Sequence, residues 1–255
     1  MTKNASDRKD KQTRLILSIP YKITSADTDM NLRLRMSALS NLLIQSAINS
    51  AETLRAGFLD LEKQNLFWVL SRMTIEIDKP LVWNDSLEVE TWPKDVKKIF
   101  YLRDFLVRNN EQNIVAKATS GWLAIDKLTK RPQTLKQELS DIFSELKDRH
   151  AINALPEKLF PVKEGEISEL KTTYYDIDLN GHVTSIRYID WMMDTFPVEF
   201  HKNNYPKKVS INYQNETRIN ETVQITRNTI DGKTFLFEGI NRTRNLASFH
   251  GKIFF

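Results

Sequence analysis

The side chains best suited to chemistry are concentrated within seven residues of the second half of the chain. They are Asp176, Asp178, Asn180 and His182. An amphipathic segment begins at Ser185, carries apolar residues at helical spacing and is closed by Pro197. The start of a helix offers unpaired backbone N–H groups and a positive dipole end, which can stabilise an oxyanion. The spacing therefore predicts a loop of acid–base residues delivered to the start of a buried helix.

Two structural roles for this stretch compete with a chemical one. The first is a calcium loop, because the residues from Asp176 follow the ligand spacing 1, 3 and 5 with Gly at position 6. Such a loop needs a bidentate Glu at position 12, and the cation Arg187 stands there, so calcium binding is not expected. The second is a turn rich in Asp and Asn that only caps the helix, and this alternative stays open.

The composition describes a globular chain without a membrane or nucleic-acid signature. Of its 255 residues, 40% are hydrophobic and 27% charged, enough for one large domain or two of ordinary size. No apolar run approaches the roughly 20 residues that a membrane helix needs. The net charge of +4 comes without a dense basic run, so nucleic acid is not expected. The basic side chains form either an ordinary solvated surface or a surface for an acidic protein partner.

The absence of cysteine narrows both the chemistry and the location. A chain without Cys has no disulfide, no thiolate metal site and no Cys nucleophile. We expect neither a metal nor another cofactor. A reducing cytoplasm fits this composition best. Residues 1–14 are polar and charged, which predicts a disordered tail and no secretory signal.

The elements that must position the polar loop occur twice. Hydrophobic periodicity in the first half predicts a strand at 15–23, a helix from Ser37 to Gly57, and strands at 67–77, 86–92, 99–108 and 114–125. In the second half it predicts a strand at 168–175, the helix from Ser185, and strands at 208–214, 221–227, 234–241 and 246–255. Between the halves, Thr134 and Gln137 form a capping-box pattern before a short helix.

The two copies can be compared residue by residue. Three pairs stand 149 positions apart: Asp27 and Asp176, Asp29 and Asp178, Asn31 and Asn180. At the same offset His182 stands opposite Arg33, and an alignment of WNDSLEVE with INETVQIT puts Glu216 opposite Pro80. Only the second copy has the His and the following Glu. This asymmetry favours one active site per chain, in the second half.

A strand, a long helix and four strands, repeated twice, resemble a tandem hotdog fold. The resemblance implies an α+β protein in which two copies of a long helix are each wrapped by an antiparallel sheet. The pattern D-x-N-x-H followed by Tyr188 and Trp191 resembles the C-terminal half of acyl–acyl carrier protein thioesterases of the plant and bacterial type. Residues 68–93 resemble that family's N-terminal strand pair. We expect a tail at 1–14, an N-terminal hotdog domain with a connector helix at 15–148, a linker at 149–167 and a C-terminal hotdog domain at 168–255.

The resemblance also implies a set of catalytic residues. They are Asp178, Asn180, His182 and Glu216. Plant members commonly carry Cys after this Glu, where the chain has Thr217, so a cysteine mechanism is excluded. By its chemistry, Asp178 would activate water or attack the thioester carbonyl, while Asn180 would orient the reacting groups. His182 would move the proton, with its tautomer fixed by Glu216. Which carboxylate performs which step stays open.

The expected function is hydrolysis of the thioester of fatty acyl–acyl carrier protein, which releases a free fatty acid and ends chain elongation. The carrier protein would be the partner, and the halves would form a pseudo-dimer within one chain, with a homodimer of chains left open. Alternatives are an acyl-coenzyme A thioesterase, a hotdog acyl hydratase and an acyl-binding protein without activity. We expect the acyl tunnel to run along the first-half helix beside Ala38, Leu42, Leu43 and Ala47.

Overall fold

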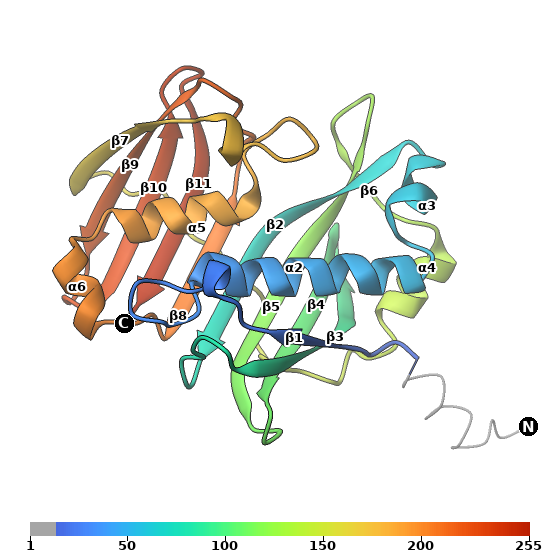
Figure 1. The fold of residues 1–255 in the computed structure, drawn as a ribbon. Helices are drawn as coiled ribbons and strands as arrows, with labels where there is room; N and C mark the ends of the chain where they lie inside the picture. Colours follow the sequence, from blue (N-terminus) through green and yellow to red (C-terminus); the bar gives the residue numbers. More distant parts are fainter. Residues whose placement is uncertain (1–13) are drawn as a thin grey trace, which may run out of the picture.

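Both halves of the chain join in one antiparallel sheet, with two helices packed on the same face (Figure 1). The computed structural model describes residues 14–255, so the tail predicted at 1–14 lies almost wholly outside the described residues. The order of strands in the eleven-stranded sheet is β1-β3-β4-β5-β2-β8-β11-β10-β9-β7, and β6 pairs with β5. The predicted α+β class and the tandem hotdog arrangement are confirmed.

The described elements follow the predicted series closely. The first half contains β1 (Leu17–Lys22), η1 (Ser25–Asp27), α2 (Met36–Thr53), α3 (Phe58–Glu62), β2 (Leu66–Ile77), β3 (Ser86–Lys97), β4 (Phe100–Asn109), β5 (Ile114–Asp126), β6 (Pro132–Gln133) and α4 (Gln137–Phe143). The second half contains β7 (Glu166–Lys171), η2 (Tyr174–Asp176), α5 (Ser185–Asp194), α6 (Val198–Asn203), β8 (Lys208–Tyr213), β9 (Thr222–Thr229), β10 (Thr234–Asn241) and β11 (Leu246–Phe254).

One hydrophobic core runs through both halves. Alternate residues of each strand face α2 and α5, as in β3, where Val89 is fully buried. Leu43 of α2, Ile189 of α5 and Ile211 of β8 belong to the same cluster of buried side chains. Each helix has an apolar stripe that needs an apolar sheet face to cover it. The alternating strands supply that face, so the strand pattern and the helical periodicity predict the same packing.

The halves meet where β2 pairs with β8. The register runs antiparallel from Arg72 opposite Asn212 to Glu76 opposite Lys208. On one face of this seam the hydroxyl oxygens of Thr74 and Ser210 lie 3.2 Å apart. At the end of the seam, Lys208 Nζ lies 3.0 Å from a carboxylate oxygen of Glu76. The seam therefore continues one sheet into the other without an unpaired edge between them.

The repeat predicted from the sequence is confirmed by matching backbone hydrogen bonds. Leu34 donates its N–H to Leu81 at 2.8 Å, and Val183 donates to Thr217 at the same distance. The two donors stand 149 residues apart in the chain, and the two acceptors stand 136 residues apart. These are the two offsets of the sequence alignment. Asp29 N to Arg33 O and Asp178 N to His182 O are likewise both 2.8 Å. The two polar loops are therefore held by the same backbone scaffold.

Three details differ from the sequence prediction. Strand β3 continues past Pro93, where the register with β4 shifts and so accommodates a residue that has no N–H to donate. Helix α4 begins at Gln137 after Lys136, with no side-chain cap, so the predicted Thr134 capping box is wrong. A second helix, α6, follows Pro197, where the sequence predicted only the end of α5.

Residues 149–167 run across the opposite face of the sheet. Leu159 donates its N–H to Asn212 at 2.8 Å, and the carboxylate of Glu157 accepts from Ser210 and Lys252, each at 2.8 Å. Glu157 also donates its N–H to Thr74 in the first half at 3.0 Å. This segment thus contacts both sides of the seam, while the division into separate domains stays a prediction. No helix within residues 14–255 is long and apolar enough to cross a membrane.

We predict that residues 1–150 do not fold alone. Separation exposes the β2 edge and the part of the core that α5 covers, and an unpaired apolar edge favours aggregation. The fragment should be insoluble or lack near-ultraviolet circular dichroism, while the full chain gives a folded spectrum. A soluble, monomeric fragment with cooperative unfolding would contradict the account of the seam.

Candidate active site

The loop before α5 is shaped by the carboxylate of Asp178. One of its oxygens accepts backbone N–H groups from Asn180 at 2.8 Å and from His182 at 3.4 Å. Gly181 has φ +77°, and the matching residue of the first copy, Leu32, has φ 61°. Only glycine adopts this left-handed region without steric cost. The second copy therefore makes the same turn with less strain.

The structure brings His182 and Glu216 into direct contact. His182 Nε2 lies 2.8 Å from a carboxylate oxygen of Glu216, and the side chains are 33% and 37% exposed. The contact forms because Val183 donates its N–H to Thr217, which holds the loop against the segment that carries Glu216. A carboxylate on Nε2 favours the tautomer with its proton there, so Nδ1 is left as a proton acceptor.

The carboxylate of Asp178 and the amide of Asn180 are not joined to this pair. Asp178 contacts His182 through the backbone N–H and not through the imidazole ring. The exposed amide of Asn180 makes no hydrogen bond with any other described residue, so it can turn toward a bound molecule. The sequence therefore predicted the contact between His182 and Glu216, but not that the Asp178 carboxylate and the Asn180 amide stay separate from it.

Two arginines at Glu216 were missed in the sequence. Arg218 Nη2 lies 2.6 Å from a Glu216 oxygen, and Arg244 donates to the backbone carbonyl of Glu216 at 3.1 Å. Arg218 could have been found, because residues two apart in an extended segment share a face. Arg244 comes from the turn between β10 and β11 and left no local signal.

The carboxylate of Asp176 stabilises the start of the loop and the helix that follows it. Its carboxylate accepts from the N–H of Thr173 at 2.7 Å and from Nε of Arg187 at 2.7 Å. Burial alone would raise the pKa of Asp176, but these hydrogen bonds and the Arg187 charge outweigh burial and lower it. Asp176 is therefore a structural anion.

Thr217, at the position where a cysteine was considered, points away from the loop. It is fully buried, and its hydroxyl lies 2.8 Å from the hydroxyl of Ser248. Tyr188 packs nearby, and burial raises its pKa to about 12. Neither side chain is placed or ionised to attack a substrate.

The corresponding loop of the first copy is locked by Arg33. Its Nε and Nη2 lie 3.0 and 2.9 Å from one carboxylate oxygen of Asp29. Arg33 also donates to the backbone carbonyls of His201 and Asn204 around the end of α6. The matching oxygen of Asp178, Oδ2, accepts no hydrogen bond from the described part of the chain. Only the second copy thus presents a free carboxylate oxygen beside an imidazole.

A hollow lies over the loop of the first copy, but its described lining contains no counterpart of the His182–Glu216 pair. It encloses about 870 Å³, partly open to solvent, between Arg33, Arg187, Asp190 and Tyr205. His201 also lines it, with Nε2 3.1 Å from the backbone carbonyl of Met193. Asp29 in this hollow is already paired with Arg33. The volume of the hollow therefore does not make the first-copy loop the reactive one.

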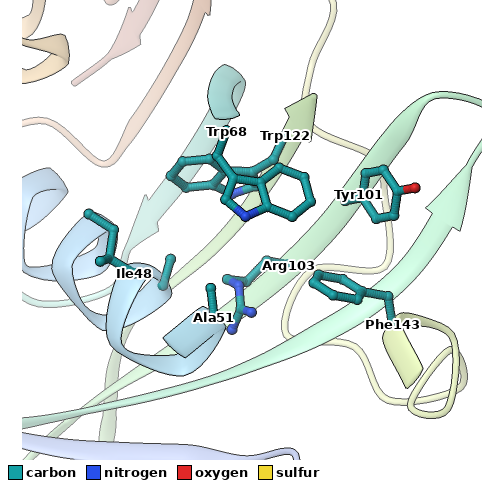
Figure 2. A pocket seen from close by; sticks show the side chains of 8 residues that line it. Ile48, Ala51, Trp68, Tyr101, Arg103, Trp122 and Phe143 are labelled. Atoms are coloured by element: carbon teal, nitrogen blue, oxygen red, sulfur yellow. The ribbon is translucent and has the colours of Figure 1, made fainter. Parts of the chain in front are cut away.

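A second cavity lies between α2 and the sheet of the first half (Figure 2). It encloses about 390 Å³, partly open to solvent, and its lining is mostly apolar and aromatic. Its lining residues are Ala47, Ile48, Ala51, Trp68, Tyr101, Arg103, Trp122 and Phe143. An apolar, aromatic lining of this kind suits a hydrocarbon group.

In the second half, phenylalanines fill the equivalent space. At the offset of 149 residues, Ala47 and Ala51 correspond to Phe196 and Phe200. The strand registers place Phe235 where the first half has Arg103. The ring of Phe196 lies 4.6 Å from that of Phe200 and 4.8 Å from that of Phe235, measured between centroids. The cavity is therefore a feature in which the first copy differs from the second.

The cavity lies along α2 beyond the reactive loop. In the first copy, the loop and residues Arg187, Asp190 and Met193 of α5 line one hollow. The same relation carried to the second copy puts the His182 loop opposite the stretch of α2 from residue 38 to residue 44. Ile48 and Ala51, which line the cavity, follow about one to two turns later along the same helix.

Models of one protein family match both halves. Residues 16–143 match the acyl-ACP thioesterase N-terminal domain, and residues 160–249 match the acyl-ACP thioesterase C-terminal domain. The palmitoyl-acyl carrier protein thioesterase of Gossypium hirsutum is 28% identical over 238 residues, which are 88% of this chain and 57% of the relative. Oleoyl-acyl carrier protein thioesterase 2 of Arabidopsis thaliana is 27% identical over 220 residues, 80% of this chain and 60% of the relative. The chain thus spans little more than half the length of these relatives.

Solved structures show the same fold. An acyl-ACP thioesterase from Bacteroides thetaiotaomicron superposes with a TM-score of 0.88 at 25% identity, covering 96% of this chain and 98% of that one. The 12:0-ACP thioesterase from Umbellularia californica superposes with a TM-score of 0.82 at 20% identity, covering 94% and 96%. The second likeness concerns the fold alone.

We predict that Asp176→Asn lowers the free energy of unfolding at pH 7 by about 2 kcal/mol, the size of hydrogen bonds to a charged group. Because the folded-state pKa of Asp176 is lowered, its stabilisation is present above the unfolded-state pKa of about 3.9 and is lost as pH falls through the folded-state value. The difference from wild type in urea unfolding should therefore shrink below about pH 4.

Asp27→Asn is the matched control. Asp27 accepts the same bond from the N–H of Thr24 at 2.9 Å but has no arginine partner in the described chain. Its substitution should cost clearly less at pH 7. Equal losses in the two variants would show that the Arg187 contact contributes nothing.

Proposed function

The chain belongs to the acyl-ACP thioesterase family, and we propose that it hydrolyses fatty acyl–acyl carrier protein to a free fatty acid. The observation that carries this proposal is the contact between His182 and Glu216 beside a free oxygen of Asp178. The first copy keeps the loop but neutralises the carboxylate with Arg33. One active site per chain, in the second half, follows from this difference.

In the proposed reaction, water attacks the thioester carbonyl and the carbon–sulfur bond breaks. Asp178 accepts a hydrogen bond from the attacking water through Oδ2 and raises its nucleophilicity. His182 takes the proton at Nδ1 and returns it to the carrier's thiolate, while Glu216 stabilises the imidazolium. The amide of Asn180 orients the thioester. The first backbone N–H groups of α5 stabilise the oxyanion.

The acyl chain would occupy the cavity beside α2. Its apolar lining suits a hydrocarbon chain, and it lies along the helix that faces the reactive loop. Filling of the equivalent space by Phe196 and its neighbours supports the assignment of chain-length preference to the first half.

The same proposal includes the protein partner, the arrangement of the two halves and the cellular compartment. An acidic carrier protein fits the net charge of +4, and the relatives that the chain resembles are named for substrates carried by acyl carrier protein. We also propose that the two halves act as a pseudo-dimer within the chain, supported by the β2–β8 seam, and that the protein works in the cytoplasm.

We predict that Asp178→Asn and His182→Ala each lower kcat by roughly 100-fold or more, as removal of an acid–base group does. The measurement is release of free thiol from acyl–acyl carrier protein, with the coenzyme A thioester of the same chain run in parallel. Faster hydrolysis from coenzyme A would favour the acyl-coenzyme A alternative.

Asp29→Asn is the matched control in the inactive copy. It removes the same loop-shaping carboxylate, which Arg33 neutralises, and should leave kcat within a few-fold of wild type. Comparable losses for Asp29→Asn and Asp178→Asn, in folded proteins, would mean that both copies take part.

Thr217→Ala tests the nucleophile question separately. The variant loses the buried bond to Ser248 and should unfold about 1 kcal/mol more easily. Its kcat should stay close to wild type. A loss as large as that of Asp178→Asn would overturn the assignment.

We predict that Ala47→Phe shifts preference toward shorter acyl chains. The substitution places in the first copy the residue found as Phe196 in the second, and a ring at this position occupies the cavity. The measurement is kcat/KM over a series of chain lengths. An unchanged length profile in an active, folded variant would exclude this cavity as the acyl site.

A further inference from the structure

The cavity beside α2 contains one buried cation. Arg103 projects from β4 into the lining, where Figure 2 shows its guanidinium beside Ala51. The residue is only 3% exposed. Its Nη1 donates to the hydroxyl oxygens of Ser50 at 2.9 Å and Thr91 at 3.2 Å. Its Nη2 has no hydrogen-bond partner in the described chain.

The other polar groups of the lining are already satisfied. Trp68 Nε1 donates to the carbonyl of Ala56 at 2.8 Å. Trp122 Nε1 donates to Ser120 at 2.8 Å. Tyr101 accepts from the backbone N–H of Leu135 at 2.6 Å through its hydroxyl oxygen. Among the nitrogen donors of the described lining, Arg103 Nη2 is therefore the one left for a bound molecule; the Tyr101 hydroxyl accepts from Leu135 and keeps its own proton to donate.

The charge of Arg103 also lacks compensation. No carboxylate of residues 14–255 forms an ion pair with it, and burial lowers the pKa of the guanidinium to about 9. An unpaired buried donor costs free energy, and a buried cation costs more. The fold does not require this cation, because Phe235 occupies the corresponding position in the second copy.

We propose that Arg103 determines specificity for acyl chains that carry an acceptor oxygen on their distal carbons, the oxygen accepting a hydrogen bond from Nη2. This inference deepens the proposed function and rests on it. The shared chemistry is an oxygen with a free lone pair, supplied by a hydroxyl, an oxo group or a terminal carboxylate. The aromatic and alanine side chains contact the hydrocarbon, and Arg103 binds the oxygen through a hydrogen bond. A plain chain leaves Nη2 without a partner after water is displaced.

The first experiment compares acyl–acyl carrier proteins of equal chain length. Plain, hydroxy, oxo and terminal-carboxy chains, with the oxygen moved along the distal carbons, are assayed for kcat/KM. Wild type should prefer at least one oxygenated chain by about tenfold, since a bond to a charged donor is worth at least that factor. The preferred chain identifies which group supplies the oxygen: a hydroxyl, an oxo group or a terminal carboxylate. A preference for the plain chain at every position would overturn the proposal.

Arg103→Met removes the donor and keeps an unbranched apolar side chain. It should abolish the preference for the oxygenated chain or reverse it, measured as the ratio of kcat/KM for the oxygenated and the plain chain. Arg103→Lys keeps a charge and a donor with less reach, and should keep part of the preference. If Arg103→Met does not fold, the wild-type panel and Arg103→Lys still decide. Unchanged selectivity in both variants would also overturn the proposal.

A binding experiment separates this proposal from the proposed function. Free fatty acids, plain and oxygenated, compete with a fluorescent fatty acid for wild type and for Arg103→Met, with no hydrolysis required. Tighter binding of an oxygenated acid by about tenfold, lost in Arg103→Met, supports the Arg103 site even where no carrier thioester is hydrolysed. Hydrolysis of plain chains without any such difference supports the proposed function and overturns the role of Arg103.

Discussion

The pairing of β2 with β8 is the contact on which the rest of the molecule depends. Five backbone-paired positions, from Arg72 opposite Asn212 to Glu76 opposite Lys208, join a six-stranded and a five-stranded sheet into one. The seam fixes α2 and α5 side by side over a shared core. It thereby brings α5 of the second half to the loop of the first, where Arg187 and Met193 line the hollow beside Arg33.

Within this frame the copies have diverged in opposite ways. The second copy keeps an imidazole and a free carboxylate oxygen in its loop, and its interior is filled by rings around Phe196. The first copy closes its loop with Arg33 and keeps its interior open beside Ala47. In the proposed function, chemistry and chain binding are divided between copies that share one scaffold. Neither change disturbs the backbone bonds common to both loops.

Local and repeated features were predictable from the sequence, and long-range contacts were not. Period-2 alternation located the strands, and the constant offset aligned the two loops, because both signals are local or repeated. The approach of Arg244 to Glu216 depends on a distant turn and has no such signal. The capping pattern at Thr134 failed because Lys136 is the N-cap residue of the helix. Of the four helix residues expected beside the acyl tunnel, Ala47 alone lines the cavity, because the cavity lies toward the end of α2, beside Ile48 and Ala51.

The most direct test of the division between the copies is a crystal structure with a non-hydrolysable acyl–carrier analogue, in which an amide replaces the thioester. The amide carbonyl should lie beside Asp178 and His182, within hydrogen-bond distance of the start of α5. The chain should follow α2 into the cavity next to Ala47. Binding of the carbonyl in the hollow beside Arg33, with the α2 cavity left without the chain, would contradict the account.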